Sequence, residues 1–180
     1  MTNAAFDAAV DRIRAGNREG LREIYDAYGD KVYRLFLGKV RHREDAEDLT
    51  SDFFLKLWEL AGTHRSGTPH KSWMMTIARN MAVDHLRRVS REIPDEDVEM
   101  HESLTERTTA EDTVLGEMSA AHILSVLPES EREIVMMHLS ADLTFREIAE
   151  VLGIPLGTAA WKYRSAIGKL QRLAKEGKLL

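Results

Sequence analysis

Hydrophobic residues recur along most of the chain at the three- and four-residue spacing of amphipathic helices. Alternating runs of apolar and polar residues, which are typical of strands, are nearly absent. In the stretch from Glu44 to Leu60, one apolar stripe is expected to face a core. Its members are Ala46, Leu49, Phe53, Leu57 and Leu60. The pattern therefore predicts an all-α fold.

A second face of the same predicted helix is acidic. At about 100° per residue, four carboxylates fall within an arc of about 60°. They are Asp45, Asp48, Asp52 and Glu59. Like charges on one helix face repel by a few tenths of a kcal/mol per pair. Such a face is either solvated or kept for a basic partner, and this helix alone leaves both interpretations open.

Further helices are predicted on both sides of the acidic one. The first runs from Ala4 to Ala15, and Asn17 is a plausible cap for a second. Gly29 and Asp30 are expected to break that helix before a third begins. After Leu60, a polar loop containing Gly and Pro leads to a long helix that Ser72 is expected to cap.

One side of the helix after Ser72 combines an aromatic ring, an amide and arginines within about 80°. These residues are Trp73, Thr76, Asn80, Asp84, Arg87 and Arg91. Arginine suits phosphate, tryptophan stacks on bases and an amide reads a base edge, so the row can bind a nucleic-acid strand. The alternative is a solvated face with a half-buried tryptophan. In the preceding loop, His64, Arg65, His70 and Lys71 are expected to gather positive charge at one end.

Residues 93–117 lack a sustained apolar period and carry a net charge of −8, whereas residues 1–92 and 118–180 carry +2 and +1. This segment is expected to be an acidic flexible linker between two small helical domains. The chain's total charge of −5 therefore says little about the charge of each domain.

The second domain contains a predicted helix-turn-helix. Glu129 to Leu139 forms one helix, and Thr144 with Glu147 forms a capping box for the next. Gly153 is expected to end that helix, and Thr158 to lie in the first turn of the following one. Two short helices joined by a tight glycine-containing turn are typical of DNA-binding proteins.

The composition limits the kinds of functional site that the chain can form. The chain has no cysteine, which excludes disulfides and thiolate metal sites. Its seven histidines are scattered, so neither a metal nor a cofactor is expected, and no enzymatic constellation stands out. No apolar run approaches the length of a membrane span, and the N-terminus does not resemble a secretory signal. The expected location is the cytoplasm.

Three stretches resemble the extracytoplasmic-function (ECF) group of bacterial RNA polymerase sigma factors. They are DAEDLTSDFFLKLW, SWMMTIARNMAVDHLRR and LPESEREIVMMHLSADLTFREIAEVLGIPLGTA. The resemblance implies a domain at 1–92 that docks on core polymerase and melts the −10 element. It also implies a linker at 93–117 and a helix-turn-helix domain at 118–180 that reads the −35 element. The implied partners are core polymerase, through its clamp coiled coil and flap, promoter DNA and an anti-sigma factor.

The resemblance also gives the candidate residues their roles. Polymerase binding is implied for Asp45, Asp48 and Asp52. Contact with the −10 element, including a flipped base, is implied for Lys71, Trp73, Asn80, Arg87 and Arg88. Contact with the −35 element is assigned to Thr158, Trp161, Lys162, Arg164 and Lys169.

The sequence departs from the family pattern in two places. Ser51 and Asp52 stand where the family usually has a Gln-Glu pair, and the recognition helix holds fewer basic residues than is common in the family. A sigma mimic that sequesters an anti-sigma factor without binding DNA is therefore the rival hypothesis. A conventional two-domain repressor would leave the acidic face unexplained.

Overall fold

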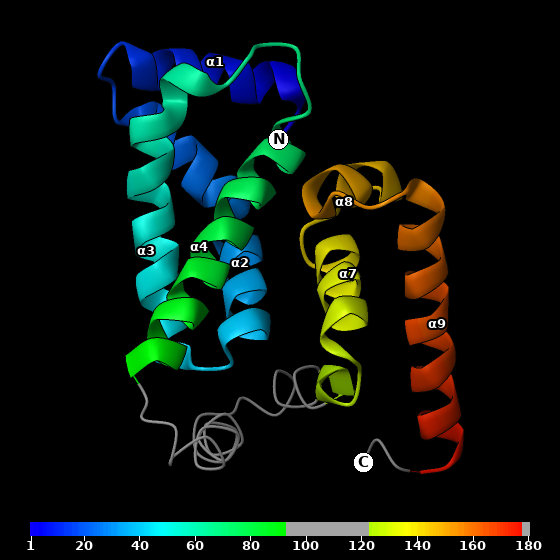
Figure 1. Ribbon diagram of the computed structural model, residues 1–180. Helices are drawn as coiled ribbons and strands as arrows, with labels where there is room; N and C mark the ends of the chain where they lie inside the picture. Colours follow the sequence, from blue (N-terminus) through cyan, green and yellow to red (C-terminus); the bar gives the residue numbers. More distant parts are fainter. Residues whose placement is uncertain (93–122, 178–180) are drawn as a thin grey trace.

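The computed structural model describes residues 1–92 and 123–177, and these residues are all-α, as predicted (Figure 1). The first group of helices consists of α1 (Asn3–Arg14), α2 (Glu19–Val40), α3 (Arg43–Leu60), the 3₁₀ turn η1 (Ala61–Thr63) and α4 (His70–Glu92). The second consists of α7 (Glu129–Leu139), α8 (Phe145–Leu152) and α9 (Leu156–Lys175). The predicted linker at 93–117 lies outside the described residues.

The apolar stripe predicted on α3 faces the core, apart from Leu60 at its end, which is half-buried. On α3, Ala46, Leu49, Phe53 and Leu57 are buried, and on α4 Met74, Met75 and Ala78 lie against them in one cluster. In Figure 1, α1 lies across one end of the bundle that α2, α3 and α4 form. The face of α3 that carries Asp48, Asp52 and Glu59 is exposed.

The predicted break at Gly29 and Asp30 is wrong, because α2 continues through both residues to Val40. Glycine inside a helix costs about 1 kcal/mol relative to alanine. Here the buried stripe carries on through Tyr28, Val32 and Phe36, which are fully or almost fully buried. Burial of each large side chain contributes about 1.5–3 kcal/mol, so packing outweighs the local preference of Gly29.

Two predicted caps differ in detail from the structure. Asn17 accepts a hydrogen bond from the backbone N–H of Glu19 at 2.9 Å, but the residue directly before the helix is Arg18. The helix predicted to start at Ser72 begins at His70. The hydroxyl of Ser72 donates to the carbonyl oxygen of Pro69 at 3.1 Å and so does not cap an N–H group.

The helix-turn-helix forms as predicted. The hydroxyl of Thr144 accepts a hydrogen bond from the N–H of Glu147 at 3.3 Å, and the carboxylate of Glu147 accepts one from the N–H of Thr144 at 2.8 Å. Gly153 ends α8 at φ +64°, a left-handed conformation that suits glycine. Ile154 and Pro155 then lead the chain into α9.

The two groups of helices pack against each other. Ile148 and Val151 of α8 belong to the same buried cluster as Met75 and Ala82 of α4. Figure 1 shows α7 and α8 lying between α9 and the first group. A large apolar cluster is therefore shared by both groups, and Leu127, Val135 and Ala166 form a second, smaller one within the second group.

Candidate nucleic-acid interface

The acidic face of α3 is exposed along most of its length. Asp48 and Asp52 are exposed, and neither carboxylate has an ion pair with any residue of 1–92 or 123–177. Glu59 pairs with Lys56 at 2.9 Å. Two carboxylates one helical turn apart are thus left available for a basic partner.

Asp45 lies at the other end of this face and is held by its neighbours. Its carboxylate lies 3.3 Å from Nδ1 of His42 and 3.3 Å from Nε2 of His85. His85 belongs to α4, so Asp45 joins α3 to α4. The structure therefore separates Asp45 from Asp48 and Asp52, which the sequence pattern had grouped together.

An exposed leucine lies within the acidic face. Leu55 is 64% exposed and follows Asp52 by three positions, which places both residues on one side of α3. Leu55 was not among the candidate residues predicted from the sequence. A signal was present, since Leu55 is an apolar residue outside the stripe that contains Phe53 and Leu57. The face offers a basic partner an apolar contact as well as two charges.

The predicted row on α4 is exposed over most of its length. Asn80, Arg87, Arg88 and Arg91 are exposed, together with Thr76 and Asp84. Arg87 lies 3.6 Å from Asp84, an exposed pair of the kind that contributes little to stability. This face can therefore present an amide and several guanidinium groups to a nucleic-acid strand.

Trp73 and Lys71 are placed differently from the rest of that row. Trp73 is half-buried, with its ring centroid 5.0 Å from that of His64 and 6.1 Å from that of Phe6. The ammonium group of Lys71 donates to the backbone carbonyl of Asp142 at 2.9 Å. Both side chains thus contact other parts of the chain.

The loop before α4 is less basic than its sequence indicated. His70 is 2% exposed, and burial lowers the pKa of its imidazole to about 4. Its Nδ1 contacts the side-chain oxygen of Asn3, so Nδ1 carries the proton and Nε2 accepts the hydroxyl of Tyr28. The expectation that His70 adds positive charge is therefore wrong, whereas Arg65 is exposed and does add it.

On α9, the candidate residues differ in exposure. Trp161 is 59% exposed and Arg164 is exposed, while Thr158 and Lys162 are half-buried. Lys169 is bound within the domain, since its ammonium lies 2.8 Å from both carboxylate oxygens of Glu131. Glu131 is 6% exposed and also accepts a hydrogen bond from Ser165 at 3.0 Å. Lys169 thus neutralises a buried carboxylate of α7.

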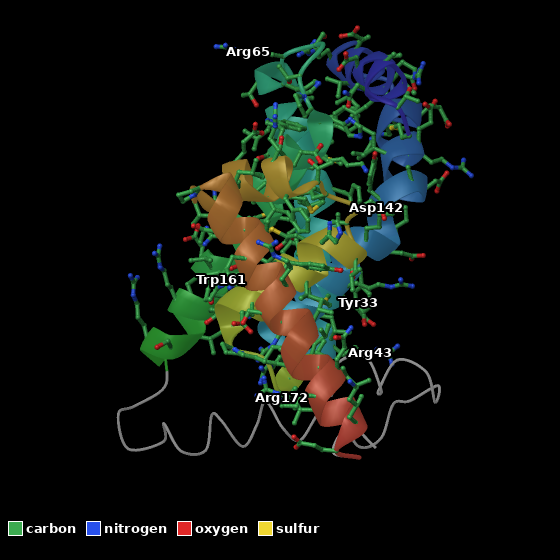
Figure 2. The ribbon with its side chains drawn as sticks, turned by 90° about the vertical axis from the view of Figure 1, so that its right-hand side faces the viewer. Tyr33, Arg43, Arg65, Asp142, Trp161 and Arg172 are labelled. Atoms are coloured by element: carbon green, nitrogen blue, oxygen red, sulfur yellow. The ribbon has the colours of Figure 1, made fainter. Side chains whose placement is uncertain are left out.

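Arg172 extends the outer face of α9. It follows Trp161 by three helical turns, so the two residues lie within about 20° of each other around the helix, and Figure 2 labels both. Arg172 is exposed and was not among the predicted contacts. The repeat Trp161, Arg164, Gly168, Arg172 at helical spacing was the sequence signal that could have identified it.

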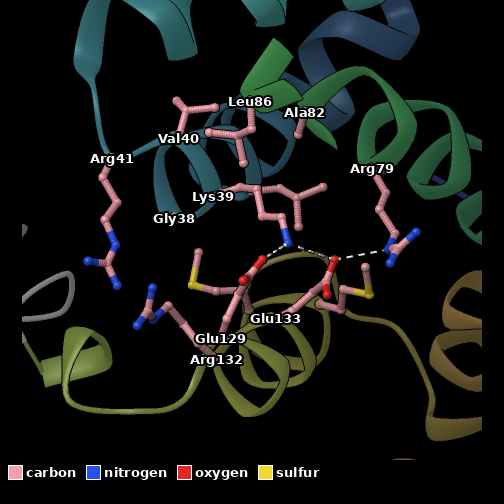
Figure 3. A pocket seen from close by; sticks show the side chains of 13 residues that line it. Gly38, Lys39, Val40, Arg41, Arg79, Ala82, Leu86, Glu129, Arg132 and Glu133 are labelled. Atoms are coloured by element: carbon pink, nitrogen blue, oxygen red, sulfur yellow. Dashed lines mark hydrogen bonds and ion pairs between the residues drawn. The ribbon is translucent and has the colours of Figure 1, made fainter. Parts of the chain in front are cut away.

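A pocket of roughly 270 Å³ lies where α7 meets α2 and α4. Figure 3 shows Lys39 between Glu129 and Glu133, and Arg79 on the far side of Glu133. Arg79 Nε lies 3.0 Å from Glu133, and Lys39 Nζ lies 3.5 Å from it. The pocket therefore lies at the seam between the two groups of helices, and these ion pairs cross it.

Within the described part of the chain, no group of three or more His, Asp or Glu residues is arranged to hold a metal ion. No helix of that part is long and apolar enough to cross a membrane. The candidate binding surfaces of that part are therefore the acidic face of α3 and the basic faces of α4 and α9.

Family models match both groups of helices. The model for sigma-70 region 2 matches residues 24–92, and that for sigma-70 region 4 matches residues 123–172. The first of these matches contains the faces of α3 and α4, and the second contains the helix-turn-helix. Helix α1 lies outside both.

Three similar proteins are named as RNA polymerase sigma factors. The chain is 32% identical to the ECF RNA polymerase sigma factor BldN of Streptomyces coelicolor over 91% of this chain and 64% of that relative. It is 25% identical to the ECF RNA polymerase sigma factor SigW of Bacillus subtilis, over 83% and 86%. Its identity to the RNA polymerase sigma-H factor of Pseudomonas aeruginosa is 26%, over 98% and 99%.

Two solved structures share the fold. CnrH in complex with the cytosolic domain of CnrY aligns with a TM-score of 0.70 and 18% identity, over 96% of this chain and 98% of that one. The sigma factor RpoE of Bartonella quintana, in complex with the anti-sigma factor NepR, aligns with a TM-score of 0.69 and 21% identity, over 86% and 96%. At these identities the likeness concerns the fold.

Proposed function

Because the chain belongs to the sigma-70 family of RNA polymerase sigma factors, in its extracytoplasmic-function group, we propose that it acts as an alternative sigma factor. In this role it binds core RNA polymerase in the cytoplasm and directs it to the promoters of a specific regulon. Proteins of this family are transcription initiation factors and not enzymes. The observation that carries the proposal is the exposed row Asn80, Arg87 and Arg88 on α4, within the part that matches sigma-70 region 2.

The proposed docking face for core polymerase is the exposed side of α3. Asp48 and Asp52 provide two charges with no ion pair elsewhere in the described chain, and Leu55 adds apolar area between them and Glu59. A basic coiled coil of the polymerase clamp fits this chemistry, because charges of opposite sign steer association and fix register. Asp45 takes part at the edge of the face, where it also orients α3 against α4.

The proposed contact with the −10 element is the exposed side of α4 with the loop before it. Arg87 and Arg88 suit the phosphates of a separated strand, and Asn80 suits a base edge. Flipping a base out of the stack costs a few kcal/mol, which these contacts offset. Lys71 joins this site when it exchanges its hydrogen bond to Asp142 for a phosphate. Trp73 lies at the edge of the site, half-buried beside His64 and Phe6.

The proposed contact with the −35 element is the outer face of α9. Trp161 and Arg164 reach base edges, while Thr158, Lys162 and Arg172 provide backbone contacts. Lys169 contributes indirectly, because its ammonium group is bound to Glu131. An anti-sigma factor is the proposed regulator and the polymerase flap a proposed second contact for this domain.

Reconstituted transcription tests the proposal. Purified protein is mixed with core polymerase and fragmented genomic DNA, and the 5′ ends of the transcripts are mapped. A sigma factor yields starts that share −10 and −35 sequences and that disappear when the protein is omitted. A sigma mimic, which sequesters an anti-sigma factor and binds no DNA, yields none; the exposed Trp161 on a helix with few free cations is the observation in its favour.

A further inference from the structure

The N-terminal helix α1 contacts the loop that precedes α4, although some 60 residues separate them in the sequence. The carboxylate of Asp7 is the main link. One oxygen accepts a hydrogen bond from Nε2 of His64 at 2.7 Å, and the other accepts one from the backbone N–H of Gly67 at 2.8 Å. These two hydrogen bonds lower the pKa of the Asp7 carboxyl, so it is ionised near neutral pH.

A second residue of α1 forms hydrogen bonds to the start of the same loop. The guanidinium of Arg14 donates from Nε to the carbonyl oxygen of Ala61 at 3.1 Å, and from Nη2 to the carbonyl oxygen of His64. Asp7 and Arg14 therefore hold the loop at its beginning and at its middle. Hydrogen bonds in which one group is charged are roughly twice as strong as neutral ones.

His64 is the first residue of this loop, and its side chain is buried. It is 3% exposed, and its ring lies 5.2 Å from Phe6 of α1 and 5.0 Å from Trp73 of α4. Nδ1 of His64 is buried and has no hydrogen-bond partner among residues 1–92 and 123–177. The ring orientation therefore depends on one polar contact, the hydrogen bond to Asp7.

The tip of the loop is exposed but ordered by its own hydrogen bonds. Thr68 donates to the carbonyl of Arg65 from its N–H at 3.2 Å and from its hydroxyl at 2.6 Å. Gly67 has φ +80°, a conformation that L side chains rarely adopt, and points its N–H at Asp7. Residues 65–69 are all exposed, so a loop with a fixed shape presents Arg65 to solvent.

We propose that Asp7 is a positioning residue for the promoter loop, residues 64–69, and that it holds this loop in the shape that receives the single-stranded −10 element. The inference rests on the proposed function. Preorganisation increases affinity, because the loop is ordered before the strand arrives. Both matched family models leave α1 out, so neither assigns this role to Asp7.

The test uses the full chain with core polymerase. The probe is a labelled single-stranded oligonucleotide that carries the −10 sequence of a promoter mapped with the unaltered protein. Asp7→Ala is expected to weaken binding of this probe roughly tenfold, since two hydrogen bonds to a charged group are lost. Affinity for core polymerase should not change, because the hydrogen bonds of Asp7 go to His64 and Gly67 and not to α3. Asp7→Asn should restore part of the loss, since its side-chain oxygen can still accept the N–H of Gly67.

Glu23→Ala serves as the matched control. It removes the exposed ion pair between Glu23 and Arg12 of α1 but no contact to the loop, so probe binding should stay at the wild-type level. Amide hydrogen exchange of Gly67 in the full chain gives a readout that does not need polymerase. Asp7→Ala should speed this exchange, while Glu23→Ala should not.

The outcomes separate this inference from the proposed function. If the unaltered protein fails to bind core polymerase or the probe, the proposed function is wrong. If it binds both, and a folded Asp7→Ala variant binds the probe equally well, the role of Asp7 is overturned while the proposed function stands. An equal loss with Glu23→Ala would also overturn it, because a general effect on α1 would then explain the result.

Discussion

The ammonium group of Lys71 donates a hydrogen bond to the backbone carbonyl of Asp142 at 2.9 Å. The carboxylate of the same Asp142 pairs with Lys31 of α2. A candidate −10 contact is thus held by the segment between α7 and α8. A phosphate at Lys71 would compete with this carbonyl oxygen for the ammonium group.

Charge reversal at Glu133 should open the seam between the two groups of helices. Its side chain is 12% exposed and lies between Lys39 and Arg79. In Glu133→Arg a third cation would lie beside Lys39 and Arg79, with Glu129 still paired to Lys39. Like charges placed this close cost several kcal/mol. The radius of gyration from small-angle X-ray scattering should increase, with the circular dichroism of the helices unchanged.

Glu150→Arg is the control for this experiment. Glu150 is exposed on α8, so the same change of charge should leave the radius of gyration at the wild-type value. An unchanged radius in Glu133→Arg would show that these charges do not hold the seam.

Acid should destabilise the fold through His70. Its pKa is about 4 in the folded protein and about 6.5 in an unfolded chain. The unfolded state therefore takes up a proton first, and stability is lost as the pH falls from 6.5 towards 4. Between pH 7 and pH 5 this group alone accounts for about 2 kcal/mol.

Urea unfolding at both pH values measures this loss. The double variant Tyr28→Phe, His70→Phe removes the titrating ring and its hydroxyl partner together, so no buried hydroxyl is left unpaired. It should lose about 2 kcal/mol less than the wild type between pH 7 and pH 5. Equal losses would show that His70 is not responsible.

Lys169 should matter for stability and little for DNA affinity. In Lys169→Ala the carboxylate of Glu131, whose side chain is 8% exposed, loses its cation. Unfolding free energy should fall by about 1–3 kcal/mol. The salt dependence of promoter binding by the holoenzyme should stay within error of wild type, whereas a change of slope by one phosphate would place Lys169 on DNA.

Arg164 and Lys162 should affect DNA binding in different ways. Arg164 is exposed next to Trp161 and is the candidate for a base edge, where arginine discriminates by about 1–3 kcal/mol. Arg164→Ala should relax the preference at one −35 position. Lys162→Ala should weaken all sequences alike and reduce the salt slope by about 0.9. Promoter selection that ignores both changes would favour the sigma mimic.

Local signals predicted much of the fold. The capping box of Thr144 and Glu147, the stop at Gly153 and the stripe on α3 all follow from neighbours in the sequence, and all are present. The break predicted at Gly29 was wrong, because it depends on residues that are distant in the sequence. Whether a glycine ends a helix depends on what its neighbours bury, and Tyr28 and Val32 pack against distant residues.

The sites were harder to predict, because long-range contacts change the state of single residues. His70 was counted as basic, but burial beside Tyr28 keeps it neutral. Lys169 was assigned to DNA, yet its charge is bound to Glu131, 38 positions away. The contact of Asp7 with the promoter loop left no periodic signal in the sequence, since it joins a helix to an irregular segment.

Docking of α3 on core polymerase is the central claim, and the affinity of the full chain for core polymerase tests it most directly. In Asp48→Lys, Asp52→Lys the charge of the exposed face is reversed. The matched control is Asp26→Lys, Asp30→Lys, which reverses two exposed carboxylates one turn apart on α2.

All three proteins should fold, since none of these side chains is buried. We expect the wild type and the α2 variant to bind core polymerase with equal affinity, and the α3 variant to lose binding by at least about 100-fold, as truncated interfacial charges do. Wild-type affinity in the α3 variant, or no binding by the wild type itself, would contradict the account.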